Sequence, residues 1–295
     1  MSDNEIIGDA AQVDLGHTRG RALRQLLRNP LGIAGGTMLV LFIAVAVLAP
    51  VLAPYSPSAV HFDAPFQRTL TVGYLFGTDD LGRDILSRVL YGTRASLLVG
   101  GMSVLLAIVV GTPLGLISGY WPWVDSIVSR LTDLMLAFPF LIIAVGLAAI
   151  NGPSLTNAAI ALGSAQIPTM TRVVRAETLR HKNLEFVLAA RSLDASGGRI
   201  LTQHILPNAA SAVIVQATVI MPVAIIGEAV LSFLGLGIQP PTPSLGIMLS
   251  DAQQYLFRAP AAAVIPGVAI AIICLAFNLF GDALRDALDP NTKRR

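Results

Sequence analysis

Long stretches without a charged side chain constrain this sequence more than any other feature. A helix needs about 20 residues to cross the roughly 30 Å hydrocarbon layer of a membrane, because each residue advances it by about 1.5 Å. The chain is also 54% hydrophobic and 13% charged, whereas soluble domains carry about 25% charged residues. We therefore expect an all-α, polytopic membrane protein. The uncharged stretches are Leu31 to Ala53, Ala95 to Val124, Leu134 to Thr171, Ile200 to Gly227, Ala229 to Ser250 and Ala259 to Gly281.

Six membrane-spanning helices are predicted from these stretches. The 38 residues from Leu134 to Thr171 would make a helix of about 57 Å, nearly twice the membrane, so they must turn back, at Asn151-Gly152-Pro153. The fifth span is expected to begin after a break at Leu206-Pro207. Prolines within 229–250 favour an irregular or re-entrant connection there. The predicted spans are 31–53, 95–119, 127–150, 154–172, 209–227 and 259–281.

Basic residues indicate the orientation. With six spans, 14 of the 20 lysines and arginines lie on the side that holds both termini, which predicts that this side is cytoplasmic. Residues 1–30 are expected to form a cytoplasmic tail whose Leu23, Leu26 and Leu27 lie on an amphipathic helix at the membrane surface. Residues 283–295 form a second tail. The expected location is the inner or plasma membrane, in contact with lipid.

A dense polar motif lies in the extracytoplasmic segment 54–94, which is too long to be a simple turn. Its mixed charges allow two interpretations. The motif could cap a helix that runs from about Arg83 to Tyr91, or it could be a solvated turn. The residues concerned are Gly77, Thr78, Asp79, Asp80, Gly82, Arg83 and Asp84.

Few charges fall inside the predicted spans. Arg130 and Asp133 are three residues apart and are expected to pair on one helix face. Glu228 would lie about 29 Å beyond Ala209 on a helix, and so near the outer membrane surface. It could polarise an outer gate, together with Ser232 and Phe233 on the translocation pathway, or it could face water.

Patterns typical of enzymes are missing. The two lysines complete no phosphate-binding Gly-x-x-x-x-Gly-Lys loop, and there is neither a His-Glu-x-x-His pair for zinc nor a Gly-x-Ser-x-Gly turn. We expect no enzymatic activity, no metal and no bound cofactor. The net charge of +2 gives no reason to expect a nucleic-acid partner.

The cytoplasmic segment 173–208 carries a helical apolar pattern with small residues at Ala189-Ala190 and Ala195-Ser196-Gly197-Gly198. Two short helices joined by a tight glycine turn would project from the membrane, and small side chains would let another protein approach closely. An ordinary interfacial loop is the alternative interpretation.

The same segment resembles the EAA loop of ABC-importer permeases, in Glu185-Phe-Val-Leu-Ala-Ala-Arg191-Ser-Leu-Asp194 followed by His204-Ile-Leu-Pro-Asn208. With the motif at 76–84, Gly227 to Gly237, Gln239 to Pro243 and Asn278 to Pro290, the sequence resembles the second permease subunit of the dipeptide, oligopeptide and nickel importers, over about Arg24 to Pro290. Two departures are an Asp at 194, where the family has glycine, and a Leu at 188, where it has an acid.

The resemblance implies a type I importer fold, with 31–53 as a peripheral helix, 54–94 as an outer lid and 95–282 as the permease core. It implies a homologous permease, two ATPase subunits that bind the ATP and magnesium, and an extracytoplasmic substrate-binding protein. A dipeptide or oligopeptide is the expected cargo, with glutathione, haem and nickel left open. The alternatives are a stand-alone secondary transporter or channel, and a membrane scaffold. The residues expected to couple to the ATPase are Glu185, Phe186, Leu188, Ala189, Ala190, Arg191, Leu193, Asp194, Ala195, Ser196 and Gly197.

Overall fold

The computed structural model describes residues 24–288, and in this part of the chain every secondary-structure element longer than a single bridge is a helix. Two isolated β-bridges, Thr71 with Tyr74 and Thr78 with Asp84, lie in the outer segment. The fold is therefore all-α, as predicted. The helices are α2 (Pro30–Leu52), α3 (Ile85–Leu106), α4 (Thr112–Tyr120), α5 (Pro122–Ala137), α6 (Phe140–Asn151), α7 (Leu155–His181), α8 (Glu185–Ser192), α9 (Gly197–Arg199), α10 (Leu206–Phe233), α11 (Leu245–Ala252) and α12 (Ala261–Leu288), with shorter pieces η1 (Ala107–Gly111), η2 (Ile200–Ile205) and η3 (Gln253–Tyr255).

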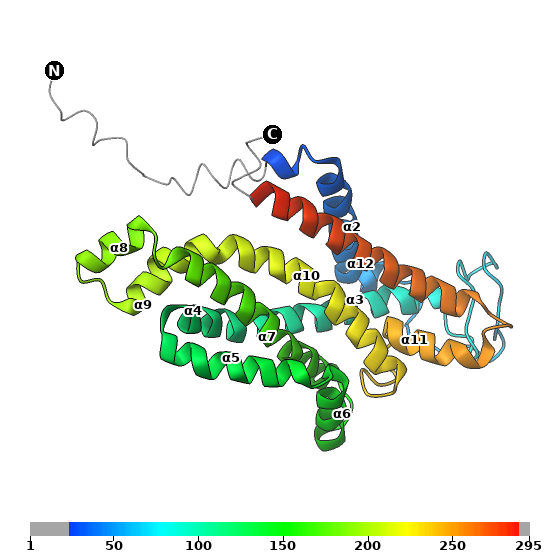
Figure 1. Ribbon diagram of the computed structural model, residues 1–295. Coiled ribbons are helices and arrows are strands. Elements are labelled where there is room, and N and C mark those ends of the chain that lie inside the picture. The colour runs from blue at the N-terminus through cyan, green and yellow to red at the C-terminus, as the bar shows by residue number, and fades with distance from the viewer. Residues whose placement is uncertain (1–23, 289–295) are drawn as a thin grey trace.

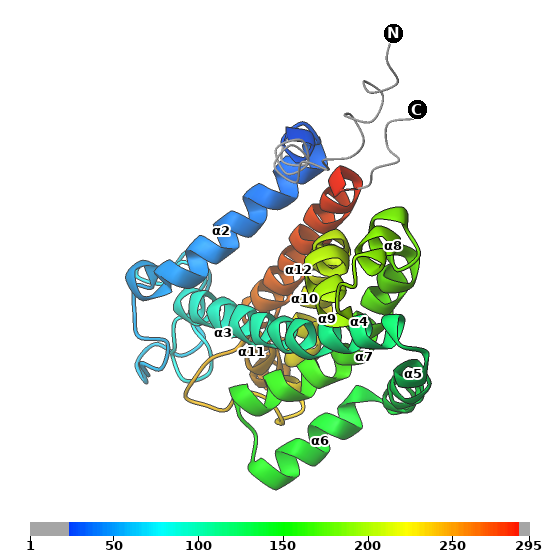
Figure 2. The same cartoon turned by 90° about the vertical axis from the view of Figure 1, so that its left-hand side faces the viewer.

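The long helices run between two ends of the molecule. Figure 1 shows α8 and α9 at one end, and the outer segment with α11 at the other. Helix α7 packs against α3, α4, α6 and α10, and α12 packs against α2, α10 and α11. Figure 2 shows α2 at the edge of this bundle and α6 at its opposite side. The two features singled out in the sequence, the outer motif and the EAA-like loop, thus lie at opposite ends.

Six helical units correspond to the predicted spans. Four are long and apolar enough to cross a membrane, namely α2, Ile85–Tyr120, Gly197–Phe233 and α12. The bent pair α5 and α6 makes a fifth if it forms one span, and α7 lies at the fourth predicted span but is not among the helices apolar enough to cross. Helix α2 matches its predicted bounds to within one residue. The part of the predicted amphipathic helix before Arg24 lies outside the described residues, as does the tail after Leu288; residues 24–26 are helical.

The predicted span 127–150 is bent sharply in its middle. Helices α5 and α6 meet at an angle of 86°, with Phe138 in extended conformation before Pro139. Proline disfavours helical backbone in the residue before it, which explains the corner. The expected pairing of Arg130 with Asp133 is wrong, because Asp133 accepts a hydrogen bond from Arg172 of α7 at 2.5 Å.

Several helices continue past their predicted ends. Helix α7 runs nine residues beyond 172 to His181, α12 runs through Asp282 to Leu288, and α3 begins at Ile85, ten residues before the predicted start of the second span. Charges mark where a helix meets water, and they do not end its backbone hydrogen bonds.

Pro207 does not break the fifth span as predicted. The helix is continuous from Gly197 to Phe233, because the π-helical turn η2 lies directly before the proline. In that turn Leu206 N donates to Leu201 O, five residues back. This wider turn accommodates a residue that has no N–H and would otherwise clash with the preceding turn. The π-helical η1 precedes Pro113 in the same way.

Glycines set the closest helix contact in the core. Gly111, Gly115 and Gly119 lie four residues apart and face α7. A Cβ placed on Gly115 would lie 2.6 Å from the Val174 Cβ and 2.7 Å from the Thr171 carbonyl oxygen. Only glycine permits this approach, which is the small-residue packing typical of membrane helices. The seam fixes α4 to α7 next to the α8 end of the molecule.

Candidate functional site

Helix α8 forms a short hairpin with the start of the following helix. It ends at Ser192, and the chain turns back through Asp194, which has φ +54°. Ala195 N donates to Ala190 O, and Ser196 then caps the next helix by accepting a hydrogen bond from Arg199 N. Asp194 therefore adopts the left-handed conformation that its glycine counterpart would favour. The expected glycine turn is wrong in detail, because Gly197 lies within α9.

The inner face of α8 is anchored in the bundle. Val187 is fully buried and Ala190 is nearly so, in a cluster that includes Ile200 and Ile205 of the following helix. The Arg191 guanidinium lies 5.1 Å from the ring centre of Tyr120, at the end of α4. Because these contacts come from two directions, α8 is held in one orientation relative to the long helices.

The outer face of α8 is apolar and exposed. Leu193 is 83% exposed, and Leu184, Phe186 and Leu188 are between 39% and 47% exposed. This patch sits at the tip of the hairpin, beyond the ends of α4 and α10 (Figure 1). Such a face on a rigid support is typical of a protein contact. Of the predicted coupling residues, Glu185, Ala189, Arg191, Asp194 and Ser196 are also exposed, Ala195 and Gly197 are half-buried, and Ala190 is buried.

At the other end, the polar motif is an ordered structural element. Asp84 caps α3 by accepting hydrogen bonds from Ser87 N at 2.8 Å and Ser87 Oγ at 2.6 Å. Thr78 Oγ1 donates to Ala64 O and accepts from Gln67 N. Thr78 and Asp84 are buried, so the solvated-turn interpretation is wrong and the helix cap is confirmed, with α3 starting at Ile85. Gly77 and Gly82 both have positive φ, while Asp80 is exposed.

Two arginines connect this motif to α11. The Arg83 Nε donates to Asp79 Oδ2 at 2.6 Å, and the buried Arg88 lies 3.6 Å from the same carboxylate. Both guanidinium groups also donate to Asp251 of α11, Arg88 at 3.2 Å and Arg83 at 3.4 Å. Burial raises the pKa of Asp251, and Arg88 and Arg83 oppose this rise. Burial and the neighbouring acids also raise the pKa of the Tyr255 phenol, which keeps it neutral.

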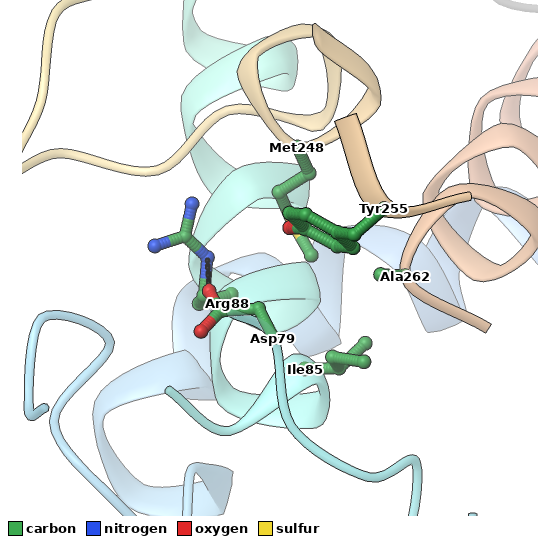
Figure 3. Close-up of a pocket in the computed structure, with 6 residues that line it drawn as sticks. All are labelled: Asp79, Ile85, Arg88, Met248, Tyr255 and Ala262. Atoms are coloured by element: carbon green, nitrogen blue, oxygen red, sulfur yellow. Dashed lines mark ion pairs between the residues drawn. The ribbon is translucent and has the colours of Figure 1, made fainter. Parts of the chain in front are cut away.

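Figure 3 shows how tightly this cluster closes. Asp79 and Arg88 lie against each other beside Tyr255 and Met248, with Ile85 below and Ala262 of α12 to the right. Most of the residues that line the small cavity among them belong to the outer segment, α3 and α11, so the cavity marks the place where these elements pack together. Within residues 24–288, no group of three His, Cys, Asp or Glu side chains is placed to hold a metal ion.

The three predicted gate residues differ in environment. Glu228 is fully buried, which rules out the interpretation that it faces water. Ser232 is also buried and its Oγ donates to Glu228 Oε1 at 2.6 Å. Phe233 is 41% exposed and its carbonyl oxygen accepts from Ser250 Oγ. The structure thus brings Glu228 and Ser232 together and leaves Phe233 at the surface.

Comparison with known proteins decides the family. Residues 111–294 match the model for the binding-protein-dependent transport system inner membrane component, and residues 19–68 match the N-terminal TM domain of oligopeptide transport permease C. The chain belongs to this family of transport permeases. The permease is 44% identical to the dipeptide transport system permease protein DppC of Alkalihalophilus pseudofirmus, over 92% of this chain and 90% of that one. It is 42% identical to the glutathione transport system permease protein GsiD of Pectobacterium atrosepticum, with the same coverage.

A solved structure supports the fold of the permease. An inward-facing form of the MetNI methionine ABC transporter superposes with a TM-score of 0.58 at 19% identity, covering 70% of this chain and 98% of the other. The match confirms the expected type I importer fold. The family is one of membrane permeases, and the permease is accordingly a multi-pass membrane protein without an enzyme activity of its own.

Sequence reasoning missed the ion pairs that brace α7. Arg175 of the permease donates from Nε and Nη2 to the two carboxylate oxygens of Asp125, at 2.5 and 2.7 Å, which ties α7 to α5. Lys182 Nζ donates to Gly119 O at 3.0 Å, at the end of α4. The four-residue spacing of Gly111, Gly115 and Gly119 was a sequence signal for the packing of α4 against α7. The partner of Arg175 is 50 residues away in sequence, so no local pattern could predict that ion pair.

Proposed function

We propose that this permease forms half of the translocation pathway of an ATP-driven importer of peptides. The observation that carries the proposal is the rigid, apolar outer face of α8, a surface that needs a protein partner. The relatives are named as dipeptide and glutathione transport permeases, which supports a short peptide as cargo. The chain itself binds no ATP; nucleotide and magnesium belong to the partner ATPases.

The proposed assembly has a homologous second permease, two ATPase subunits and an extracytoplasmic binding protein. Each ATPase would receive one α8 hairpin in a surface cleft, with Leu188 and Leu193 buried on contact. The binding protein would dock at the outer segment, at the opposite end of the molecule. The excess of basic residues near the termini and α8 supports a cytoplasmic location of that end.

In this mechanism the cargo is moved and is not chemically changed. Closure of the ATPase dimer would displace α8, and the anchors at Val187 and Ala190 would carry the displacement into α7 and α10. The paired permeases would then alternate between inward- and outward-open states. Coupling requires that the binding protein and ATP favour different states, because a ligand shifts an equilibrium only by its difference in affinity.

The structure changes which substitutions test the docking surface. Ala190 is buried in the bundle, so a bulky residue such as tryptophan there would test folding and not docking. We propose Leu193→Glu and Leu188→Glu instead, with Val72→Glu as the control, because Val72 is 98% exposed at the opposite end. Both α8 variants should abolish ATP-dependent peptide uptake and ATPase co-purification, while the control keeps ATPase co-purification.

A reconstitution experiment separates an importer from a stand-alone carrier. The permease alone in liposomes should move no peptide, and uptake should appear only with the second permease, the ATPases, the binding protein and ATP. Uptake by the permease alone would refute the proposal in favour of a secondary transporter or channel. Normal uptake by Leu193→Glu and Leu188→Glu would refute the role of α8.

A further inference from the structure

The buried carboxyl of Glu228 lies where α3, α10 and the segment that leads into α11 meet. Ser96 Oγ of α3 donates to Glu228 Oε2 at 2.7 Å, and Ser232 Oγ of α10 donates to Oε1 at 2.6 Å. Ser244, which precedes α11, is buried at the same junction, where a Cβ on Gly92 of α3 would lie 3.2 Å from the Ser244 carbonyl carbon. We propose that Glu228 is a positioning residue that fastens the re-entrant element, residues 234–252, to the helical core and so fixes the outer end of the pathway. The inference rests on the proposed transport function.

Hydrogen bonds continue from Glu228 into the irregular part of the re-entrant element, and a separate serine caps its helical part. Ser232 Oγ accepts from Ile238 N at 3.2 Å, which holds the irregular part. Ser244 Oγ accepts from Ile247 N at 3.1 Å, which caps α11. Ser232, which donates to Glu228, thus contacts both parts, because a Cβ on Gly246 of α11 would lie 2.9 Å from the Ser232 Cβ. Movement of the carboxyl would disturb both parts at once.

Close packing leaves the element no other position. A Cβ on Gly237 would lie 2.2 Å from Ser232 Oγ, and one on Gly246 would lie 2.5 Å from the Ala229 carbonyl oxygen. On α3, a Cβ at Gly92 would lie 3.1 Å from Leu245 N. Backbone therefore meets backbone around Glu228 on two sides. The Glu228 carboxyl is the polar group at the centre of the packing between α3, α10 and the re-entrant element, which glycines otherwise form.

A cavity-facing or ion-pairing role does not account for this geometry. Within residues 24–288 the contacts of the Glu228 carboxyl are with serine hydroxyls, and no arginine or lysine forms an ion pair with it. A buried acid in a membrane protein is costly unless its oxygens are hydrogen-bonded. The serines satisfy that requirement and at the same time join the elements.

The far end of the re-entrant element connects to the outer segment. Asp251, in the last turn of α11, accepts hydrogen bonds from Arg83 of the polar motif and Arg88 of α3. Helix α11 is therefore held at its start by the Glu228 cluster and at its end by the arginines. Through this helix, Glu228 determines where the predicted docking surface of the binding protein lies relative to α10.

Cysteine labelling in nanodiscs tests the proposal directly. Cys274 is the only cysteine, so Cys274→Ala gives a background for Ile238→Cys, a reporter at a position 3% exposed beside Ser232. A maleimide should label this thiol slowly in the parent and in Glu228→Gln, whose amide retains an acceptor oxygen. Glu228→Ala should raise the labelling rate about tenfold, and Ser96→Ala should raise it less, as loss of one buried hydrogen bond predicts.

An exposed reporter controls for the reactivity of the reagent, and tryptophan fluorescence separates local release from general unfolding. Val72→Cys is exposed in every variant and should be labelled equally fast throughout. The inference is overturned if Glu228→Ala labels at the parental rate, if Glu228→Gln labels as fast as Glu228→Ala, or if release accompanies global unfolding seen by the fluorescence of Trp121 and Trp123. Labelling needs neither cargo nor ATPase, so its outcome is independent of the peptide-import proposal. In the assembled importer, Glu228→Ala should also lower uptake about tenfold while Glu228→Gln retains it.

Discussion

Replacing Gly115 with alanine should separate α4 from α7 and destabilise the permease. The added Cβ would lie 2.6 Å from the Val174 Cβ, 2.7 Å from the Thr171 carbonyl oxygen and 3.0 Å from Arg175 N. Two of these three atoms belong to the backbone of α7, so a side-chain rotation cannot relieve the contact. Gly101, on α3, is the matched control, because a Cβ there meets no atom within 4 Å.

The expected magnitude follows from two opposing terms. Alanine is favoured over glycine in a helix by about 1 kcal/mol, a gain that both variants share. Overpacking a tight contact costs about 1–3 kcal/mol, and more where backbone must move. Gly101→Ala should therefore be neutral or slightly stabilising, and Gly115→Ala should lose up to about 2 kcal/mol. For a chain of this size that loss corresponds to a Tm lower by roughly 4–8 °C.

Two reporters native to the chain measure the effect. Trp121 and Trp123 are the only tryptophans, and they lie beside the end of the glycine seam, so their fluorescence follows its separation. Cys274 of α12, buried against α10, becomes accessible to a fluorogenic maleimide as those helices part. A Tm for Gly115→Ala equal to that of Gly101→Ala would show that α4 and α7 are not in close contact at Gly115.

Three further predictions concern individual side chains. Asp194→Gly should keep the Tm and ATP-dependent uptake. Asp194→Val should lower both, with a loss of about 1–2 kcal/mol in stability, because a β-branched residue disfavours φ +54°. An equal Tm for the two variants would contradict the turn geometry. Exchanging Arg175 and Asp125 should restore most of the loss, about 1 kcal/mol, that either single reversal causes, as a double-mutant cycle would measure. Burial raises the pKa of Asp251 above its value in the unfolded chain, so folding disfavours the ionised carboxylate. The difference in Tm between the wild type and Asp251→Asn should therefore fall as the pH rises from about 4 through the raised pKa of Asp251. A Tm difference that does not change with pH would contradict the burial of the carboxyl.

Features governed by local chemistry were predictable from the sequence. The uncharged run of α2 gave both ends of the helix, and Asn151-Gly152-Pro153 gave the turn, where Gly152 has φ +77°. The polar motif before the apolar run was identifiable as a possible helix cap, and Asp84 is the residue that caps α3. In each case the signal and the structure that it produces lie within a few residues of each other.

Other features depend on contacts between distant segments, and there the sequence was insufficient. The prediction of a break at Pro207 is wrong because a π-helical turn accommodates the proline. The predicted ends of α7 and α12 are wrong because charged residues continue a helix in water. Glu228 illustrates the same limit. Its serine partner on α3 is 132 residues away, so burial and exposure were equally compatible with its sequence.

The failure of the Pro207 prediction matters for the proposed mechanism. The 37-residue helix from Gly197 to Phe233 begins at the α8 hairpin and contains Glu228 near its other end, about 46 Å along its axis at 1.5 Å per residue. A break at Pro207 would let α8 move without the rest of the helix. Because the π-helical turn keeps the backbone hydrogen-bonded across the proline, a displacement of α8 must either move the Glu228 cluster or bend the helix between them. This continuity supports a mechanical connection between the face proposed to meet the ATPase and the element that Glu228 fastens at the outer end.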